Sequence, residues 1–175
     1  QHTIAVKTDG TLWSWGPNYQ GKLGHGNTNN LSSPVQIGAL TDWSFASQSL
    51  HTSHGIKTDG TLWTWGAGSL GKLGHGNTTN YSSPKQVGAL TDWAWIAAGN
   101  SHTIAVKTDG SAWSWGGDSA KGYLGHNQIN TNYSSPKQIG ALTDWFRTYC
   151  NNTHTVARKT DGTLWAWGSG AGGRL

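Results

Sequence analysis

The sequence KTDGTLWSWG, from Lys7 to Gly16, occurs four times in this chain with small changes. It returns as KTDGTLWTWG at 57–66, KTDGSAWSWG at 107–116 and KTDGTLWAWG at 159–168. The first tryptophan of successive copies is separated by 50, 50 and 52 residues. Such a period indicates one structural unit per copy. We therefore expect residues 1–175 to form a single repeat domain or a fragment of one, with repeats at approximately 1–50, 51–100, 101–152 and an incomplete 153–175.

Each unit carries the pattern of short β-strands. Ile4 and Val6 alternate with more polar residues, and Asp9-Gly10 supplies the residue types of a tight hairpin turn before TLWSWG returns. A strand is also expected after each TDW. Further strands are predicted near 2–7, 11–16 and 34–37, recurring at about +50 and +100, with almost no helix. Four antiparallel strands per unit are typical of an all-β fold of β-propeller blades; a β-solenoid is the alternative.

Tryptophan must supply most of the buried surface. The chain has 12 tryptophans and 26 glycines among 175 residues, and only 34% of its residues are hydrophobic. Trp13 and Trp15 alternate with Ser14 and so point to one face of their strand. We expect these indoles to fill the wedge between neighbouring blades, where they bring a large contact area.

The charges predict no dedicated nucleic-acid surface. The formal net charge is +4, but Lys7, Lys57, Lys107 and Lys159 each stand two residues before an aspartate, which predicts a solvated ring of mixed charge. No run of Lys and Arg suggests specific nucleic-acid binding, and no apolar run is long enough for a membrane span. The single cysteine, Cys150, excludes an internal disulfide without settling the compartment.

The histidines recur too regularly for a catalytic site. Six of the eight occupy repeated positions: His2, His102 and His154 before Thr, and His25, His75 and His126 after Leu-Gly. A residue present in every unit is better suited to a structural hydrogen bond than to catalysis. The other two, His51 and His54, are three apart and fall on opposite faces of a strand. We therefore predict no enzyme activity, no cofactor and no metal site.

Two positions depart from the pattern of the core. His54 stands where Ile4 and Ile104 stand, and Arg158 stands where Val6 and Val106 stand. A polar group at a core position predicts either a solvated edge or an unusual local structure.

Residues that differ between the copies are the candidates for a binding surface. Phe45, Trp95 and Arg147 share one phase in the strand after TDW. The loop after each WG also varies, with Tyr19 in the first copy and 117–121 in the third, and the loop before SSP carries Leu31, Tyr81 or Tyr133. Arg, Trp and Tyr are favoured anchors of protein interfaces. The alternative is sequence drift without function.

Several of these sequence motifs, taken in their fixed order, resemble a known family. GNSHTIAVKTDGSAWSWG at 99–116, GKLGHG at 21–26 and 71–76, and SSPKQVGALTDW at 82–93 resemble the regulator of chromosome condensation repeat. The resemblance implies a seven-bladed β-propeller, of which about 3.5 blades are present here. The sequences of these motifs are also similar to those of repeat proteins from bacteria, marine metagenomes and phage genomes.

We expect a non-catalytic scaffold for protein–protein interaction, as a structural part of an extracellular or viral assembly. Its partners would be another protein or neighbouring subunits of that assembly. The resemblance implies one alternative, a guanine nucleotide exchange factor for a small GTPase, and the exposed Tyr, Trp and Asn loops suggest another, a glycan-binding module. An extracellular or virion location is favoured over the cytoplasm.

The order of the strands predicts incomplete first and last blades. From inside to outside we expect the strand after TDW, then HTIAVK, TLWSWG and VQI. The first blade then lacks its inner strand and the last its outer strand. We expect the 175 residues to be a window on a longer chain, or a neighbouring subunit to cover both ends.

Overall fold

A computed structural model describes residues 1–118 and 121–171 of the chain. The elements are, in order, β1 (Thr3–Val6), β2 (Leu12–Gly16), η1 (Tyr19–Gly21), β3 (Leu31–Gln36), β4 (Trp43–Gln48), β5 (Thr52–Lys57), β6 (Leu62–Gly66), η2 (Ser69–Gly71), β7 (Tyr81–Gln86), β8 (Trp93–Ala98), β9 (His102–Lys107), β10 (Ala112–Gly116), β11 (Tyr133–Gln138), β12 (Trp145–Cys150), β13 (His154–Lys159) and β14 (Leu164–Gly168). In this described part of the chain, no helix has the length and apolar character needed to cross a membrane.

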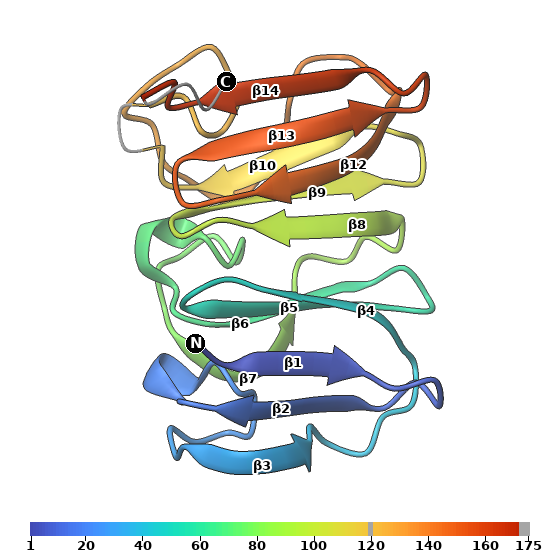
Figure 1. Ribbon diagram of the computed structural model, residues 1–175, viewed down its shortest axis with the longest axis vertical. Helices are drawn as coiled ribbons and strands as arrows, with labels where there is room; N and C mark the ends of the chain where they lie inside the picture. The colour runs from blue at the N-terminus through green and yellow to red at the C-terminus, as the bar shows by residue number, and fades with distance from the viewer. Residues whose placement is uncertain (119–120, 172–175) are drawn as a thin grey trace.

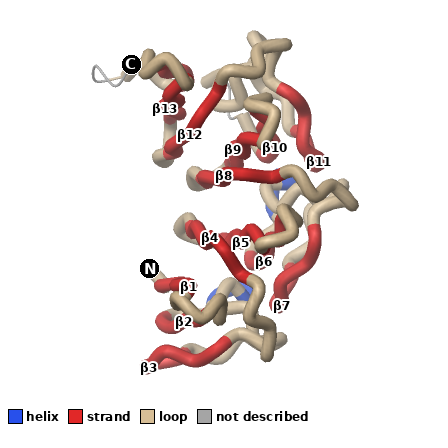
Figure 2. Tube along the Cα trace, turned by 90° about the vertical axis from the view of Figure 1, so that its right-hand side faces the viewer, coloured by secondary structure: helices blue, strands red, loops and turns tan. Residues whose placement is uncertain are grey.

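The strands form four antiparallel sheets, which are the blades of a partial β-propeller (Figure 1). Blade 1 is β1-β2-β3, blade 2 is β4-β5-β6-β7, blade 3 is β8-β9-β10-β11 and blade 4 is β12-β13-β14. Figure 2 shows the inner strands β4, β8 and β12 on one side of the stack and the outer strands β7 and β11 on the other. The all-β prediction and the order of strands within a blade are confirmed. The division of the chain at residues 50, 100 and 152 stays a prediction.

The outer strands are longer than expected. The third strand of blade 1 begins at Leu31, not at Pro34, and its register passes through a bulge between Ser14 and Gly16 of β2. Proline lacks a donor N–H, which suggests a strand beginning after it; at a sheet edge this loss is tolerated because the N–H would face solvent. The short 3-10 turns η1 and η2 were also not predicted, since two or three residues carry no helical period.

Indoles close the space between blades, as predicted for the repeated segment, although Trp13 and Trp15 themselves are only half-buried because no described blade packs on that face of blade 1. Trp65 and Trp115 are completely buried. The indole Nε1 of Trp65 donates to the Lys22 carbonyl at 3.0 Å, and that of Trp115 donates to the Lys72 carbonyl at 3.0 Å. Each bond joins one blade to the blade before it in the chain. The repeated tryptophan therefore provides both apolar contact and a hydrogen bond that fixes the angle between blades.

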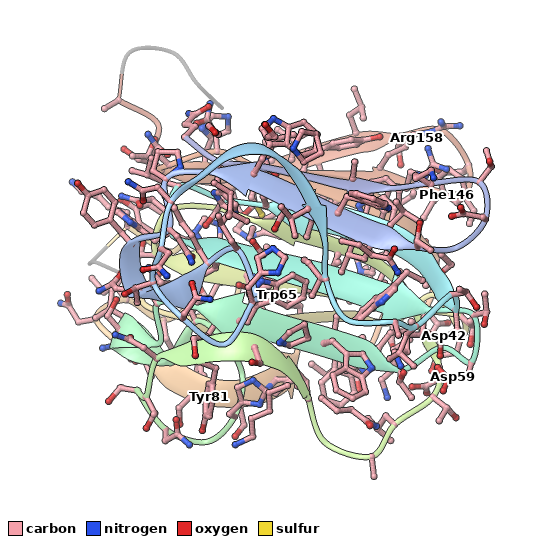
Figure 3. All side chains as sticks on the ribbon, turned by 90° about the horizontal axis from the view of Figure 1, so that it is seen from below. Asp42, Asp59, Trp65, Tyr81, Phe146 and Arg158 are labelled. Atoms are coloured by element: carbon pink, nitrogen blue, oxygen red, sulfur yellow. The ribbon has the colours of Figure 1, made fainter. Side chains whose placement is uncertain are left out.

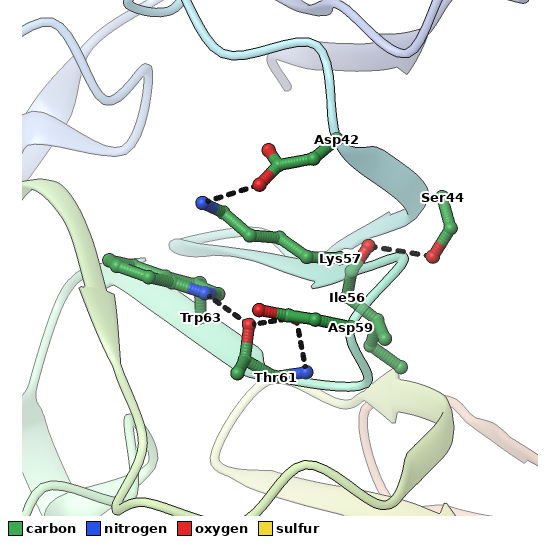
Figure 4. Close-up of polar contacts among 7 residues, drawn as sticks. All are labelled: Asp42, Ser44, Ile56, Lys57, Asp59, Thr61 and Trp63. Carbon is green, nitrogen blue, oxygen red and sulfur yellow. Dashed lines mark hydrogen bonds and ion pairs between the residues drawn. The ribbon is translucent and has the colours of Figure 1, made fainter.

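The lysines of the second to fourth copies are buried, so the predicted solvated ring is wrong for them. Lys57 Nζ lies 3.2 Å from Asp42 Oδ2, and its side chain is 8% exposed. The same nitrogen lies 4.7 Å from the centre of the Trp63 ring (Figure 4). It lies 5.2 Å from the centre of the Trp43 ring. Lys107 and Lys159 repeat this arrangement. The short spacing between each lysine and the aspartate two residues later could not reveal this pairing, because the paired carboxylate comes from the preceding TDW turn.

Lys7 is the exception and pairs with Asp9 at 3.3 Å, with a side chain 55% exposed. In the described residues, blade 1 has no inner strand that could bring a TDW segment over it. Among the described residues, blade 1 therefore lacks an inner strand and blade 4 lacks an outer strand, as expected.

Two turn glycines give a matched test of how closely the hairpin turn packs against the TDW segment. Gly60 and Gly38 both have positive φ, +77° and +62°, but a Cβ on Gly60 would collide with the Thr91 carbonyl, whereas one on Gly38 meets nothing within 4 Å. Gly38→Ala should cost only the left-handed strain of about 1–2 kcal/mol. Gly60→Ala should cost about 1–3 kcal/mol more, through overpacking. Denaturant unfolding measures both, and equal losses would contradict the crowded turn.

Candidate binding surface

The repeated histidines are occupied in structural hydrogen bonds. His2 Nε2 lies 2.7 Å from Ser53 Oγ, which in turn donates to the Lys22 carbonyl at 2.7 Å. A second set lies within blades, where His25, His75 and His126 contact the hydroxyls of Ser14, Thr64 and Ser114 at 3.0, 2.9 and 2.9 Å. His102 contacts Thr155 across blades 3 and 4. The prediction that the repeated histidines make structural hydrogen bonds is confirmed for these five residues, of which His2 and His102 bridge two blades.

His54 and Arg158, the two departures from the core pattern, have opposite environments. His54 is completely buried, and neither of its ring nitrogens makes a hydrogen bond of ordinary geometry among the described residues. Burial lowers its pKa to about 3; a contact with the Ser47 backbone opposes this shift, and His2 and Lys72 act in the same direction as burial. A solvated edge is therefore the wrong explanation at His54. Arg158 is exposed, on the face of blade 4 that no described blade covers.

Phe45, Trp95 and Arg147 are brought together from three different blades. The ring centres of Phe45 and Trp95 lie 4.5 Å apart. The guanidinium carbon of Arg147 lies 4.6 Å from the centre of the Trp95 ring. The indole of Trp95 is fixed by a hydrogen bond from Nε1 to the Thr148 carbonyl at 2.7 Å. Their shared phase in the sequence becomes contact because β4, β8 and β12 are neighbouring inner strands.

Two residues that were not predicted as binding residues extend this group. The centre of the Phe146 ring lies 5.0 Å from the Arg147 guanidinium carbon and 5.2 Å from that of Arg158. Phe146 and Arg158 lie close together, at the end of the sheets that also carries Asp42 and Asp59 (Figure 3). We call Phe45, Trp95, Arg147, Phe146 and Arg158 the aromatic–arginine ladder. The misfit of Arg158 with the core pattern was the available signal for it.

A cleft between blades 3 and 4 opens beside the ladder. It has a volume of about 470 Å³, and its lining includes Trp95, Phe146 and Arg147 from the ladder, together with Lys107 and Asp109. Phe146 is 44% exposed. The cleft therefore offers aromatic faces and a positive charge at the surface, which is the chemistry of an interface anchor.

The candidate tyrosines do not join the ladder. Tyr81 and Tyr133 begin the outer strands β7 and β11, and their hydroxyls accept hydrogen bonds from Lys85 and Lys137 at 2.8 and 2.6 Å. The bond from Lys85 lowers the pKa of Tyr81. Tyr19 is exposed in η1. The six candidates therefore separate into an inner group of three and tyrosines carried by η1 and the outer strands. In the variable loop 117–121, residues 119–120 lie outside the described part of the chain.

Two groups outside the ladder, Cys150 and Asp118, have side-chain types used in catalysis, and both have raised pKa values. Burial raises the pKa of the Cys150 thiol to about 12, so it is protonated and weakly nucleophilic at neutral pH. Burial also raises the pKa of Asp118. Within residues 1–118 and 121–171, no three His, Cys, Asp or Glu side chains gather in a group that could hold a metal ion.

Comparison with protein families gives a consistent match. The model described as "Regulator of chromosome condensation (RCC1) repeat" matches residues 9–54 and 59–106, and a second model of the same description matches residues 96–122. Protein RCC2 of Mus musculus is 48% identical over 40 residues, which are 23% of this chain and 8% of that protein.

Solved structures share the fold. Human WBSCR16 superposes with a TM-score of 0.82 at 19% identity, over 95% of this chain and 44% of that one. Prp20p from Saccharomyces cerevisiae, described with its binding properties to Gsp1p and histones, gives 0.75 at 20% identity over 96% of this chain and 42% of that one. The chain thus spans less than half the length of each of these propellers.

Proposed function

Because the chain belongs to the regulator of chromosome condensation (RCC1) repeat family, we propose that it is a non-catalytic β-propeller scaffold that binds another protein. The observation that carries the proposal is the contact of Phe45, Trp95 and Arg147 from three blades. These positions differ between copies, whereas the residues that build the blades are repeated. A residue free to vary without loss of the fold can be used for recognition.

The geometry of the ladder supports protein binding. Trp and Arg are the residue types most enriched among energetically dominant interface residues. Trp95 is held by its bond to Thr148 before any partner arrives, so little side-chain entropy is lost on binding. The adjoining cleft could receive an anchoring side chain of the partner.

Two other functions have specific support. Prp20p is described with binding to Gsp1p and histones, which supports an exchange factor for a small GTPase as the second candidate. Tyr19, Tyr81 and Tyr133 are carried on polar loops and outer strands, which supports a glycan-binding module. The proposed setting is a structural part of an extracellular or viral assembly. It rests on the similarity of the repeat motifs to those of bacterial and phage repeat proteins.

A comparison of variants separates these functions. We expect the immobilised chain to retain a protein partner that a Trp95→Ala, Arg147→Ala double variant loses, because both anchors contribute to one contact. Tyr19→Ala, which changes an exposed residue of η1, should retain it. Affinity capture with quantitative mass spectrometry measures retention. Faster nucleotide release from a small GTPase, or glycan-array binding lost in Tyr81→Ala, would favour the other functions instead.

A further inference from the structure

Two clefts of the same kind lie beside the outer strands, where one blade meets the next. The first lies between blades 1 and 2 and has a volume of about 390 Å³, and the second lies between blades 2 and 3 and has a volume of about 430 Å³. We call them the outer clefts. Both walls of each cleft belong to described blades. The equivalent lining residues are Leu40, Trp43, Trp63 and Pro84 in the first, and Leu90, Trp93, Trp113 and Pro136 in the second.

The outer clefts present apolar side chains to solvent. Leu40 is 49% exposed and Leu90 is 46% exposed, each in the turn before the TDW segment. Trp63 and Trp113 are half-buried. Together with the proline of the following blade, these side chains give each cleft an apolar surface that a ligand could cover.

Each outer cleft is also lined by a buried donor that lacks an acceptor. Trp43 and Trp93 are 3% and 2% exposed, and the Nε1 of neither has a hydrogen-bond partner among the described residues. By contrast, the indoles of Trp113 and Trp115 both donate, at 2.9 and 3.0 Å. A buried N–H is almost always paired in folded proteins. The same exception at two joints indicates a place for an acceptor from another molecule.

The orientation of Trp43 follows from its contact with Gly55. A Cβ added to Gly55 would lie 2.6 Å from Cζ3 and 2.8 Å from Cε3 of the indole. These two atoms lie on the edge of the indole opposite to Nε1. The edge that carries Nε1 therefore faces away from Gly55, and the cleft is the open space that Trp43 lines.

The outer clefts offer few side-chain acceptors. The described lining of the first contains no Asp, Glu, Asn or Gln, and its His25 Nε2 is in contact with the Ser14 hydroxyl at 3.0 Å. The second adds Gln86 and Lys85, and Lys85 Nζ donates to the Tyr81 hydroxyl at 2.8 Å. A ligand with many hydroxyl donors, such as a sugar, would leave most of them unpaired here. The fitting ligand has apolar surface and acceptors but few donors.

We propose that the outer clefts bind a proline-rich peptide segment. Proline combines an apolar ring with a carbonyl acceptor and has no backbone N–H. In the polyproline II conformation its carbonyls make no internal hydrogen bonds, and such segments dock in aromatic-lined grooves. A proline ring would pack against Leu90, Trp113 and Pro136, and a peptide carbonyl would accept the N–H of Trp93. This site lies apart from the ladder and goes beyond the proposed function.

The first test adds decaproline to the isotope-labelled 175-residue chain and follows the indole N–H signals by NMR. We expect the signals of Trp43 and Trp93 to shift downfield, because each N–H gains an acceptor. The signals of Trp65 and Trp115 should stay unchanged, since both indoles already donate at 3.0 Å. Single Trp→Phe variants assign the four signals. A Gly-Ser peptide of equal length, which lacks proline, should shift none of them.

The second test measures the affinity for fluorescent decaproline by anisotropy. The Leu40→Ala, Leu90→Ala double variant should bind about fivefold more weakly or worse, because each cleft loses apolar contact with the peptide. Both leucines are about half exposed, so folding should be kept. Leu50→Ala is the matched control: Leu50 is 41% exposed and lines neither outer cleft. It should change the affinity by less than about twofold.

Each contrary outcome has a defined meaning. Unchanged Trp43 and Trp93 signals, an equal response to the Gly-Ser peptide, or unchanged affinity in the double leucine variant would overturn the proline site. Shifts of the same two signals with a neutral oligosaccharide, but not with decaproline, would assign the clefts to saccharide instead. If a Trp95-dependent partner is captured while decaproline does not bind, the scaffold function stands and only the outer clefts fail. Leucine-dependent decaproline binding without any captured partner would have the reverse meaning.

Discussion

Replacing Trp115 by alanine is expected to lower the free energy of unfolding by about 3–5 kcal/mol. The indole is completely buried between blades 2 and 3 and lies 6.1 Å from Trp93, centre to centre. Its Nε1 shares the Lys72 carbonyl with the Thr103 hydroxyl, which donates at 2.9 Å. Alanine would leave a cavity at the joint and remove one of the two hydrogen bonds that the Lys72 carbonyl accepts from blade 3. Chemical denaturation followed by circular dichroism measures the loss.

Trp165 supplies a control of different burial. It is the first tryptophan of the same repeated segment in blade 4, the position of Trp113, and it is 50% exposed and donates only to its neighbour Thr163 at 3.3 Å. Trp165→Ala should cost less than about 1.5 kcal/mol, because it removes less buried surface. A loss as large as that of Trp115→Ala would show that burial between blades does not set the size of the loss.

Acidification is expected to destabilise the fold well above the pH at which carboxylates titrate. Burial lowers the pKa of His54 to about 3 and that of His102 to about 4, and His2, His75 and His126 are also lowered to about 4. Because the folded-state values lie below the unfolded value of 6.5, the unfolded chain binds protons first as the pH falls. The stability is complete above pH 6.5 and decreases between about 6.5 and 4. The completely buried His54 and His102 should each contribute on the order of 1 kcal/mol per pH unit.

His54→Ile tests the origin of this acid sensitivity. Isoleucine is the residue at the equivalent positions 4 and 104, and it removes two buried nitrogens without hydrogen-bond partners. We expect the variant to be more stable at pH 7 and its stability to fall less steeply between pH 6.5 and 4. Urea denaturation at a series of pH values provides the measurement. An unchanged slope would mean that His54 is not the main proton acceptor in the unfolding reaction.

The inner half of the candidate surface was accessible to sequence reasoning. Phe45, Trp95 and Arg147 occupy one phase of the repeat, and neighbouring blades of a propeller place equal phases side by side. Phe146 and Arg158 were not assigned to it, although Arg158 was recognised as unusual at a core position. A bulged register between β12 and β13 brings Arg147 opposite Arg158. The same bulge recurs in blades 2 and 3, but the alternation of residues in the sequence does not show it.

The repeat by itself determined the strand type and the packing of one blade on the next. These follow from alternation with period two and from Asp-Gly turns, which are local properties that recur at a constant interval. Only the tertiary structure decided which charges are buried. Lys57 and Lys7 have the same local sequence, yet only Lys57 is covered by a TDW segment carrying Asp42 and Trp43. Burial depends on what another strand brings to a position, and no local pattern contains that partner.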